Sequence, residues 1–383
     1  MKIVQISSHI NGAVGKIMRT VHAALRAEGH TSYIFFARGN APEDEGQERF
    51  VSKPEVYTHA LLSRLTDSAG KHSRRATKRL VRRLREIDPD VIHLHCLHGY
   101  YLHCDTLMRY LAQESRAKIV WTMHDSWAYT GHCCYYDLSG CDRWKTGCHD
   151  CPSSRAYPAS FTDRSKSNYA WKKALFTSIP RDRLTVVAPS AWLIGEVQKS
   201  FLSGYPTQVI HNGIDLTKYR PTEGAEEQPF ILGVANYWDE RKGLDTFLAL
   251  REVLDMDMTL IGLTEEQIAA LPAGIRGLAR TDTQEELIAY YSTCAVLLIP
   301  SKEENYPTVS LEGQACGARV VTFDTGGCKE TDCGNLYVAP RDVASLADTV
   351  RQVIATPKNP VNYPKMNANT MVQEYLQLYG RSI

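Results

Sequence analysis

Short apolar runs alternate with amphipathic stretches along nearly the whole chain, and this alternation constrains the fold more than any other feature. The runs have the length and composition of β-strands, and apolar residues between positions 14 and 25 recur at helical spacing. Strands that alternate with helices form parallel sheets with helices on their faces. The sequence therefore predicts an α/β fold. The expected strands are Lys2–Ile6, Ser32–Phe36, Val91–His95, Lys118–His124, Leu184–Ala188, Phe230–Ala235, Met258–Ile261, Ala295–Ile299 and Arg319–Phe323.

The length of 383 residues exceeds what one compact core accommodates, so we expect two α/β domains. A stretch with several Pro, Gly and acidic residues, from about Gly204 to Pro229, is typical of a connection between domains. We therefore expect an N-terminal domain over residues 1–203 and a C-terminal domain over residues 204–362. Apolar residues recur at roughly helical intervals near the end of the chain, which predicts a terminal helix within residues 363–383.

The charges nearly balance, with 44 Lys and Arg residues against 43 Asp and Glu residues and a formal net charge of +1. Charge therefore does not draw the whole chain to nucleic acid, and we expect no nucleic-acid partner. The N-terminus lacks the pattern of a signal peptide, and no apolar run approaches the roughly 20 residues that span a bilayer. We expect a cytoplasmic protein, in which the cysteines are thiols or metal ligands rather than disulfides.

Two glutamates eight residues apart, Glu304 and Glu312, follow the expected strand at 295–299. Pro307 suits the first turn of a helix that would carry Glu312, because a missing N–H group costs nothing there. The N–H groups of Thr308 and Val309 would then form an anion site, strengthened by the helix dipole. A diphosphate fits such a site, with one carboxylate reaching toward each sugar of a nucleotide-sugar.

The segment that carries this pair resembles the Glu-x7-Glu motif of glycosyltransferase family 4, including a Gly before the next buried strand at Gly317. Other family motifs have similar counterparts in the same order. They are His211-Asn-Gly-Ile-Asp215, Arg241-Lys-Gly243, and Thr325-Gly-Gly327 followed by Glu330. The resemblance implies the GT-B fold, in which two Rossmann-like domains face each other across a cleft and the C-terminal helix crosses back to the N-terminal domain.

The resemblance also implies roles for residues of the donor site. Glu304 would face the transferred sugar near its reacting centre, and Glu312 would bind the ribose hydroxyls. Lys242, together with Arg241, would neutralise charge on the departing diphosphate. The family usually has an Arg five residues before this Lys, and the chain has Tyr237 there. The predicted donor-binding residues are Gly12, Arg241, Lys242, Tyr306, Thr308, Val309 and Glu312.

The turn after the first expected strand contains Gly12 and Gly15, which allow the backbone to approach a ligand closely. It lacks the Gly-x-Gly-x-x-Gly pattern of a dinucleotide site. The resemblance to glycosyltransferase family 4 implies that this turn faces the donor phosphates and the acceptor.

A histidine and an aspartate, His124 and Asp125, stand where the fourth expected strand ends. A histidine at this edge can hydrogen-bond a sugar hydroxyl or stabilise an oxocarbenium-like charge. The surrounding His-Asp-x-Trp-x-x-Thr-Gly run resembles a branch of family 4 that acts in exopolysaccharide and lipid-linked glycan assembly. We therefore predict His124 and Glu304 as the catalytic residues. At the neighbouring strand end, near Cys96, stand alternatives for which we expect a structural role: His93, His95 and His98.

A cysteine-rich insertion follows over residues 133–151, and its last pair is spaced Cys-x-x-Cys. Four thiolates form a closed tetrahedral zinc site that does no chemistry. We predict structural zinc in an insertion over the acceptor cleft, with reduced cysteines that merely pack a loop as the alternative. The predicted ligands are Cys133 (or Cys134), Cys141, Cys148 and Cys151.

A basic stretch over residues 72–85 has the pattern of a helix with a narrow apolar stripe at Leu80, Val81 and Leu84. A solvated helix face explains such a run. Because the suspected acceptors are anionic lipid-linked sugars, contact with an anionic inner membrane at its cytoplasmic face is the reading that we favour.

Together these features predict a retaining glycosyltransferase of GT-B fold. It would move a hexose-type sugar from a UDP- or GDP-sugar to a glycan or lipid-linked acceptor in cell-surface polysaccharide synthesis, without a catalytic metal. An NDP-sugar epimerase of the same shape is disfavoured by the two motifs around residues 211–215 and 304–312. A non-enzymatic zinc-containing scaffold or nucleic-acid binder would use the cysteine cluster and the Arg-rich helix. It is disfavoured because no aromatic residues that could stack on bases are interleaved with the basic run.

Overall fold

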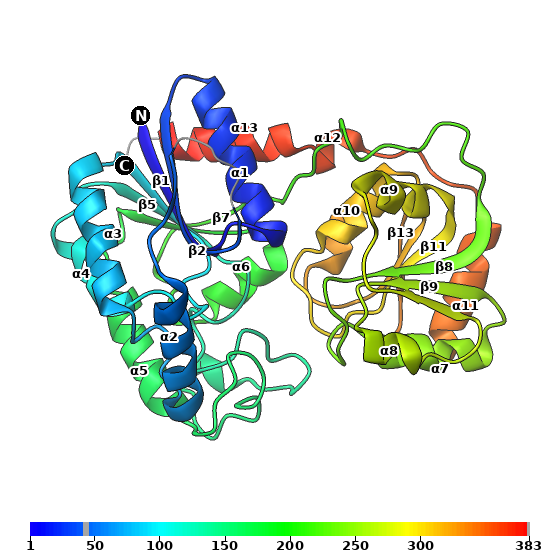
Figure 1. The fold of residues 1–383 in the computed structure, drawn as a ribbon, viewed down its shortest axis with the longest axis horizontal. Coiled ribbons are helices and arrows are strands. Elements are labelled where there is room, and N and C mark those ends of the chain that lie inside the picture. The colour runs from blue at the N-terminus through cyan, green and yellow to red at the C-terminus, as the bar shows by residue number, and fades with distance from the viewer. Residues whose placement is uncertain (41–45, 381–383) are drawn as a thin grey trace. The chain divides into compact units, whose positions relative to one another are not determined.

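A computed structural model describes residues 1–40 and 46–380 of the chain (Figure 1). The chain forms two compact units. Unit 1 comprises residues 1–210 together with the end of the chain from residue 372, and unit 2 comprises residues 211–371. Within the described ranges, no helix has both the length and the apolar character needed to span a bilayer.

Unit 1 is built on a parallel sheet in the order β3-β2-β1-β4-β5-β6-β7. The strands are β1 Lys2–His9, β2 Thr31–Arg38, β3 Gln47–Arg49, β4 Val91–Leu94, β5 Lys118–Thr122, β6 Leu184–Ala188 and β7 Thr207–Val209. The helices are α1 Gly12–Ala27, α2 Lys53–Thr66, α3 Arg74–Ile87, α4 Cys104–Gln113, α5 Ser165–Phe176 and α6 Ala191–Gln198, with a 3-10 turn at Arg143–Lys145.

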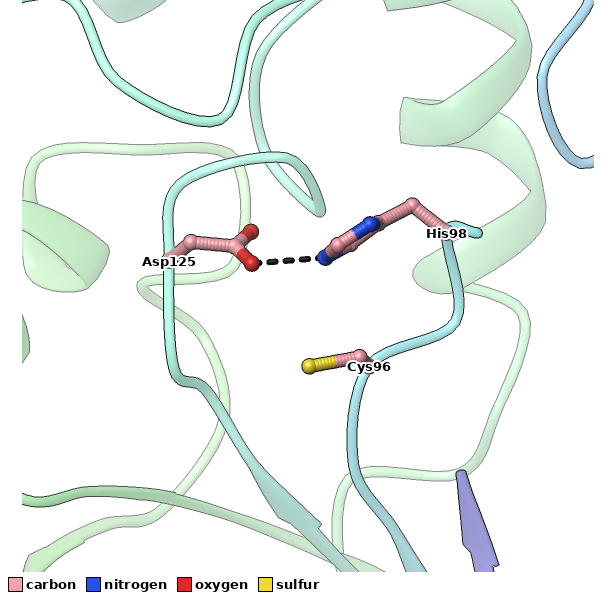
Figure 2. Close-up of side chains that lie close together, drawn as sticks. All are labelled: Cys96, His98 and Asp125. Carbon is pink, nitrogen blue, oxygen red and sulfur yellow. Dashed lines mark hydrogen bonds and ion pairs between the residues drawn. The ribbon is translucent and has the colours of Figure 1, made fainter. Parts of the chain in front are cut away.

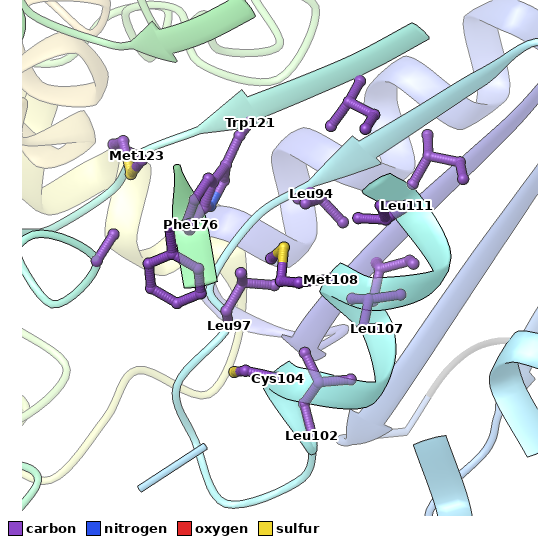
Figure 3. Close-up of a cluster of buried hydrophobic side chains, with 14 of the residues drawn as sticks. Leu94, Leu97, Leu102, Cys104, Leu107, Met108, Leu111, Trp121, Met123 and Phe176 are labelled. Atoms are coloured by element: carbon purple, nitrogen blue, oxygen red, sulfur yellow. The ribbon is translucent and has the colours of Figure 1, made fainter. Parts of the chain in front are cut away.

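Both faces of this sheet are buried, as the alternation of side chains along β2 shows. Ile34 and Phe36 pack with residues of α1, whereas Phe35 belongs to the larger core on the opposite face. In that larger core, Trp121 of β5 meets the ring of Phe176 edge-on, with the ring centroids 5.0 Å apart (Figure 3). Side chains of α4 fill the neighbouring space (Figure 3). This double burial is what the apolar runs of the sequence require.

Unit 2 repeats the architecture with the strand order β10-β9-β8-β11-β12-β13, again parallel throughout. Its strands are β8 Gln228–Val234, β9 Asp257–Ile261, β10 Ile275–Leu278, β11 Cys294–Ile299, β12 Val320–Phe323 and β13 Leu336–Ala339. Its helices are α7 Leu244–Val253, α8 Glu265–Ala269, α9 Gln284–Thr293, α10 Thr308–Ala315, α11 Val343–Ala355 and α12 Tyr363–Met366, with a 3-10 turn at Cys328–Thr331. The last helix, α13 Ala368–Gly380, begins in unit 2 and ends in unit 1.

The expected strands are all present, but the sheets contain four more, which are β3, β7, β10 and β13. All four are short and lie at or near the edges of their sheets, where few apolar residues are needed. Strand β7 corrects the reading of residues 204–229 as a connection alone, because it pairs with β6 inside unit 1. Strand β5 ends at Thr122, so His124 lies in the loop after it and not in the strand.

Candidate functional site

The predicted donor residues of unit 2 gather where the strand order of the sheet reverses. Strands β8 and β11 are neighbours, and the connections that leave their carboxyl ends run in opposite directions to β9 and β12. Open α/β sheets bind ligands in the crevice at this point. Lys242 stands in the loop after β8, and Glu304 stands in the loop after β11.

An ion pair joins these two loops, because the Lys242 ammonium donates a hydrogen bond to Glu304 Oε2. The Lys242 N–H group donates to Asp239 Oδ1 at 2.9 Å, which fixes the turn before α7. Gly243 follows with φ +81°, and a Cβ atom there would lie 2.3 Å from the Pro300 carbonyl oxygen. Only glycine fits that conformation and that contact. The glycine of the Lys-Gly pair is therefore a geometric requirement of this turn.

The carboxylate of Glu304 is nearly buried, with 11% of its side chain exposed. Burial alone would raise its pKa, but Lys242 and Arg241 outweigh burial and hold the pKa of Glu304 below its usual value. Glu304 is therefore ionised near neutral pH and faces two cations.

Arg241 contacts Tyr237, the residue that stands where the similar family usually has an Arg. Its guanidinium donates to the Tyr237 hydroxyl at 2.6 Å and to the Glu303 carbonyl oxygen at 3.4 Å. The guanidinium carbon also lies 5.6 Å from the centroid of the Tyr237 ring. Tyr237 thus positions the guanidinium group of Arg241.

Glu312 lies on α10 and is 7% exposed. The hydroxyl of Tyr291 donates to Glu312 Oε2 at 3.2 Å, and Tyr219 also bonds this carboxylate. Neither tyrosine was predicted as a site residue, because both are far from Glu312 in sequence. Helix α10 begins at Thr308 with Pro307 as its cap residue, one position later than predicted. The N–H groups of Thr308 and Val309 precede the first bond of the helix, from Ser310 to the Pro307 carbonyl oxygen.

Two further segments of unit 2 lie at the same edge. Tyr306 is buried and stacks on His211, with the ring centroids 5.0 Å apart and the planes at 17°. The resembling Gly-Gly loop leads into the 3-10 turn at 328–331, and Cys328 in this turn lies within electrostatic range of both Glu304 and Lys242. The structure therefore brings the four motif segments of the C-terminal half to one edge of the second sheet.

In unit 1, two predicted residues lie at the carboxyl edge of the first sheet. Gly12 opens α1 directly after β1 with φ +75°, a conformation that favours glycine. His124 lies in the loop after β5 and is bonded to a second histidine, with His95 Nδ1 and His124 Nε2 at 3.1 Å. Burial lowers the pKa of His124 to about 4, so this ring is neutral at physiological pH.

Beside His124, a cysteine, a histidine and an aspartate form a compact polar group (Figure 2). His98 Nε2 and Asp125 Oδ2 are 2.6 Å apart, and His98 Nδ1 bonds the Tyr157 hydroxyl at 3.1 Å. Burial would lower the pKa of His98, but the carboxylate of Asp125 holds it well above its usual value. His98 and Asp125 therefore form a charged pair, and Cys96 lies against it (Figure 2). The prediction gave His98 a structural role and missed Tyr157 altogether.

The predicted zinc ligands lie in the long connection between β5 and α5. The thiol groups of Cys133 and Cys151 are hydrogen-bonded to each other. The Gly131 N–H group donates to Cys148 Sγ at 3.1 Å. Cys141 is half-buried against the same core.

No three of these sulfurs lie within 4.8 Å of one another, whereas in the part of the chain that the structure describes Cys96, His98 and Asp125 do form such a group. Of the two adjacent cysteines, Cys133 contacts Cys151, while Cys134 lies near Asp125 and His98. Zinc in this insertion stays a prediction, with Cys133 as the better candidate of the two.

We expect about one zinc per chain in protein purified without a polyhistidine tag, because four thiolates bind zinc tightly. Metal analysis by mass spectrometry measures it. Cys133→Ser should lower the zinc content, and Cys134→Ser is the matched control that should leave it unchanged. Wild-type protein without zinc would refute the zinc site. Equal zinc content in the two variants would refute Cys133 as the ligand.

Comparison with known proteins gives the class that this fold and these loops define. The family model "Glycosyltransferase Family 4" matches residues 12–218, and the model "Glycosyl transferases group 1" matches residues 228–356. The chain belongs to glycosyltransferase family 4, and the protein is a glycosyltransferase. A putative colanic acid biosynthesis glycosyl transferase of Escherichia coli K12, WcaC, is 25% identical over 380 residues, with 93% of this chain and 91% of WcaC covered.

Solved structures confirm the predicted GT-B fold. Sucrose-phosphate synthase from Thermosynechococcus elongatus matches with a TM-score of 0.70 at 17% identity, over 99% of this chain and 98% of that one. Anabaena HepE, crystallised with UDP and glucose, matches with a TM-score of 0.65 at 15% identity over 99% of both chains.

Proposed function

We propose that this glycosyltransferase moves a sugar from a nucleotide diphosphate-sugar to a glycan or lipid-linked acceptor, with retention of the anomeric configuration. The observation that carries the proposal is the Lys242–Glu304 ion pair at the sheet edge where α10 begins. Arg241 lies near the same carboxylate, so two cations and the first N–H groups of α10 gather at this edge. A diphosphate is the ligand that such a set of groups fits.

The charges of this edge suit the departure of a nucleoside diphosphate. Lys242 and Arg241 would stabilise the negative charge that develops on the diphosphate as its bond to the sugar breaks. The acceptor oxygen would form its bond on the same face of the sugar, and its proton would pass to the departing phosphate oxygen. Glu304, held as a carboxylate by the same cations, would position the sugar ring. Glu312 would bind the ribose.

The donor and the acceptor are proposed from the relatives and from the resemblance. HepE, which shares the fold, was crystallised with UDP and glucose, so UDP-glucose is the first donor to test. The colanic acid relative supports a role in cell-surface polysaccharide synthesis. His124 would act at the sugar, as the resemblance of its segment implies.

A thermal-shift panel of UDP- and GDP-sugars with the full chain tests the donor class, and transfer assays with the best binder follow. We expect one nucleotide to raise the melting temperature, and a product whose anomeric proton coupling in NMR matches that of the donor. A product of opposite anomeric configuration would refute retention. Release of free sugar as the sole product, without use of any acceptor, would refute transfer and favour an epimerase-like reaction.

Contact with an anionic membrane is part of the same proposal, but we assign it to a surface other than the basic helix α3. The apolar residues of the predicted basic helix, Leu80, Val81 and Leu84 of α3, are buried in the core and leave only charges outside. The neighbouring α2 instead exposes Tyr57 and Leu61, with 72% and 59% of their surfaces accessible.

We define the α2 patch as Tyr57, Leu61, Leu65 and Phe161 with the flanking Arg64 and Arg155. The first three are spaced i, i+4 and i+8 and share one helix face, and Phe161 adds a ring that is 55% exposed. Both guanidinium groups lie over the Phe161 ring, at 5.0 and 5.4 Å from its centroid. An apolar stripe with cations at its border fits the surface of an anionic bilayer. The loop that carries Phe161 also supplies Tyr157 to His98, which links the patch to the candidate acceptor side.

We expect the protein to float with vesicles that contain phosphatidylglycerol and to stay behind with pure phosphatidylcholine. The triple variant Tyr57→Ser, Leu61→Ser, Leu65→Ser should lose most of this binding. Leu248→Ser with Val253→Ser, two exposed apolar residues of α7, is the control that should bind like the wild type. Wild-type protein that never floats would refute the membrane contact, and a triple variant that binds normally would refute the α2 patch.

A further inference from the structure

Three histidines stand in a row across unit 1; His93 and His95 are buried, and the row ends at the half-buried His124. The His93 and His95 rings are 4.0 Å apart between centroids, and the His95 and His124 rings are 5.4 Å apart and nearly parallel at 15°. His93 and His95 are 0% and 1% exposed. Burial lowers the pKa of His93 to about 3 and that of His95 well below its usual value, so all three rings are neutral near pH 7.

The far end of this row is fixed by the last helix of the chain. His93 Nδ1 bonds the Tyr379 hydroxyl at 2.7 Å, and His93 Nε2 bonds Thr122 Oγ1 at 2.7 Å. Thr122 Oγ1 in turn bonds the Tyr375 hydroxyl at 3.0 Å. Both nitrogens of His93 are therefore hydrogen-bonded, and these two bonds fix the orientation of the ring. His95 packs against the ring in this orientation.

The bonds of His95 determine which of its nitrogens carries the proton. Nδ1 is 3.1 Å from His124 Nε2, and no described atom partners His95 Nε2. Buried N–H groups without an acceptor are rarer in proteins than buried acceptors that lack a donor. The neutral ring is therefore protonated at Nδ1 and donates to His124 Nε2. A neutral His124 that accepts at Nε2 must carry its own proton at Nδ1.

We propose that His95 is a positioning residue that holds His124 in the Nδ1–H tautomer, so that His124 presents a hydrogen-bond donor to a hydroxyl oxygen of the transferred sugar. The proposal rests on the proposed role of His124 for its consequence in transfer, but the tautomer itself is a property of the free protein. The stack of His93 and α13 keeps the His95 ring in place for this bond.

The first test is the ¹⁵N spectrum of histidine-labelled protein, with the signals of His124 assigned by their loss in His124→Asn. We expect a protonated Nδ1 and an unprotonated Nε2 on His124 in the wild type. His95→Leu should give a mixture of both tautomers, and the control His22→Leu, which removes another buried histidine of unit 1, should leave the signals unchanged. A wild-type His124 protonated at Nε2 would overturn the proposal without any reference to activity.

The second test is kinetic. His95→Leu should lower kcat by about tenfold with the donor KM little changed, because the lost tautomer acts on the reacting complex. His95→Asn should recover most of the rate, since its amide N–H can take the place of the Nδ1–H group. Equal loss in both variants, at equal melting temperature, would overturn the positioning role. If His124→Ala transfers sugar normally while the tautomer result stands, the proposed role of His124 fails and the tautomer assignment survives.

Discussion

Lys242→Ala should lower kcat for sugar transfer by roughly 100- to 1,000-fold, the effect expected when a preorganised charge at a developing anion is removed. The ammonium of Lys242 bonds Glu304 and would face the departing diphosphate. Its loss leaves a nearly buried carboxylate whose pKa then rises, because burial is no longer outweighed by the lysine. The rate should therefore also fall at a higher pH on the acid side than it does in the wild type. Steady-state kinetics at saturating donor, from pH 5 to 8, measure both effects.

Lys358→Ala is the matched control for this prediction. Lys358 is also ion-paired, with Glu227 at 3.0 Å, but it lies outside the loops that follow β8 and β11. We expect its rate to stay within about twofold of the wild type, as for a surface pair. If the Lys242→Ala enzyme had a normal kcat, and its rate fell at the same acid pH as that of the wild type, the assignment of Lys242 and Glu304 to the donor site would be contradicted.

Asp67→Asn should destabilise unit 1 by about 3 kcal/mol, because removing one partner of a buried ion pair leaves the other uncompensated. Asp67 ends α2, and its Oδ1 lies 2.6 Å from His132 Nδ1, with the two side chains 3% and 0% exposed. Its other oxygen accepts the N–H group of Arg164 at 2.8 Å. The carboxylate therefore joins the two ends of the connection between β5 and α5. Asparagine keeps the left-handed backbone of φ +48°, but it removes the charge and replaces one of the two acceptor oxygens by an NH2 donor.

Urea unfolding followed by tryptophan fluorescence measures this change, since five of the six tryptophans belong to unit 1. Burial would lower the pKa of His132, but Asp67 outweighs it and raises the pKa. The pair therefore stabilises the fold fully below the unfolded histidine pKa, and its contribution is lost as the pH rises through the folded value. The difference in the free energy of unfolding between wild type and Asp67→Asn should therefore shrink at alkaline pH.

Asp142→Asn is the control, because Asp142 is an exposed side chain of the same connection. It should lower the free energy of unfolding by less than about 0.5 kcal/mol. If Asp67→Asn were as stable as the wild type, the Asp67 carboxylate would not stabilise the connection between β5 and α5.

The order of elements and the residues of the donor edge could be predicted because they depend on local pattern. A central parallel strand is buried on both faces, so β11 reads as six consecutive apolar residues. Edge strands need no such run, and β3, with the sequence Gln-Glu-Arg, gave no signal at all. The Lys-Gly turn was visible because its glycine is required by sterics.

Contacts between distant segments could not be predicted in the same way. Tyr291 and Tyr219 bond Glu312 from other elements, and nothing in their own surroundings distinguishes them from core tyrosines. His98 was judged by its neighbours in sequence, whereas its charge depends on Asp125, which comes from the next strand end. The choice between Cys133 and Cys134 likewise depends on the path of the insertion.

The end of the chain completes the domain that its beginning starts, and this has a consequence for how the protein is made. Tyr375 and Tyr379 supply hydrogen bonds to Thr122 and His93 of unit 1, but they leave the ribosome only after the whole of unit 2. Domains generally fold in the order of synthesis. Here the first domain stays without its last helix while the second is translated. A chimera that exchanges the two domains must accordingly transfer residues 372–380 with the N-terminal half, since a single cut between 210 and 211 separates neither unit cleanly.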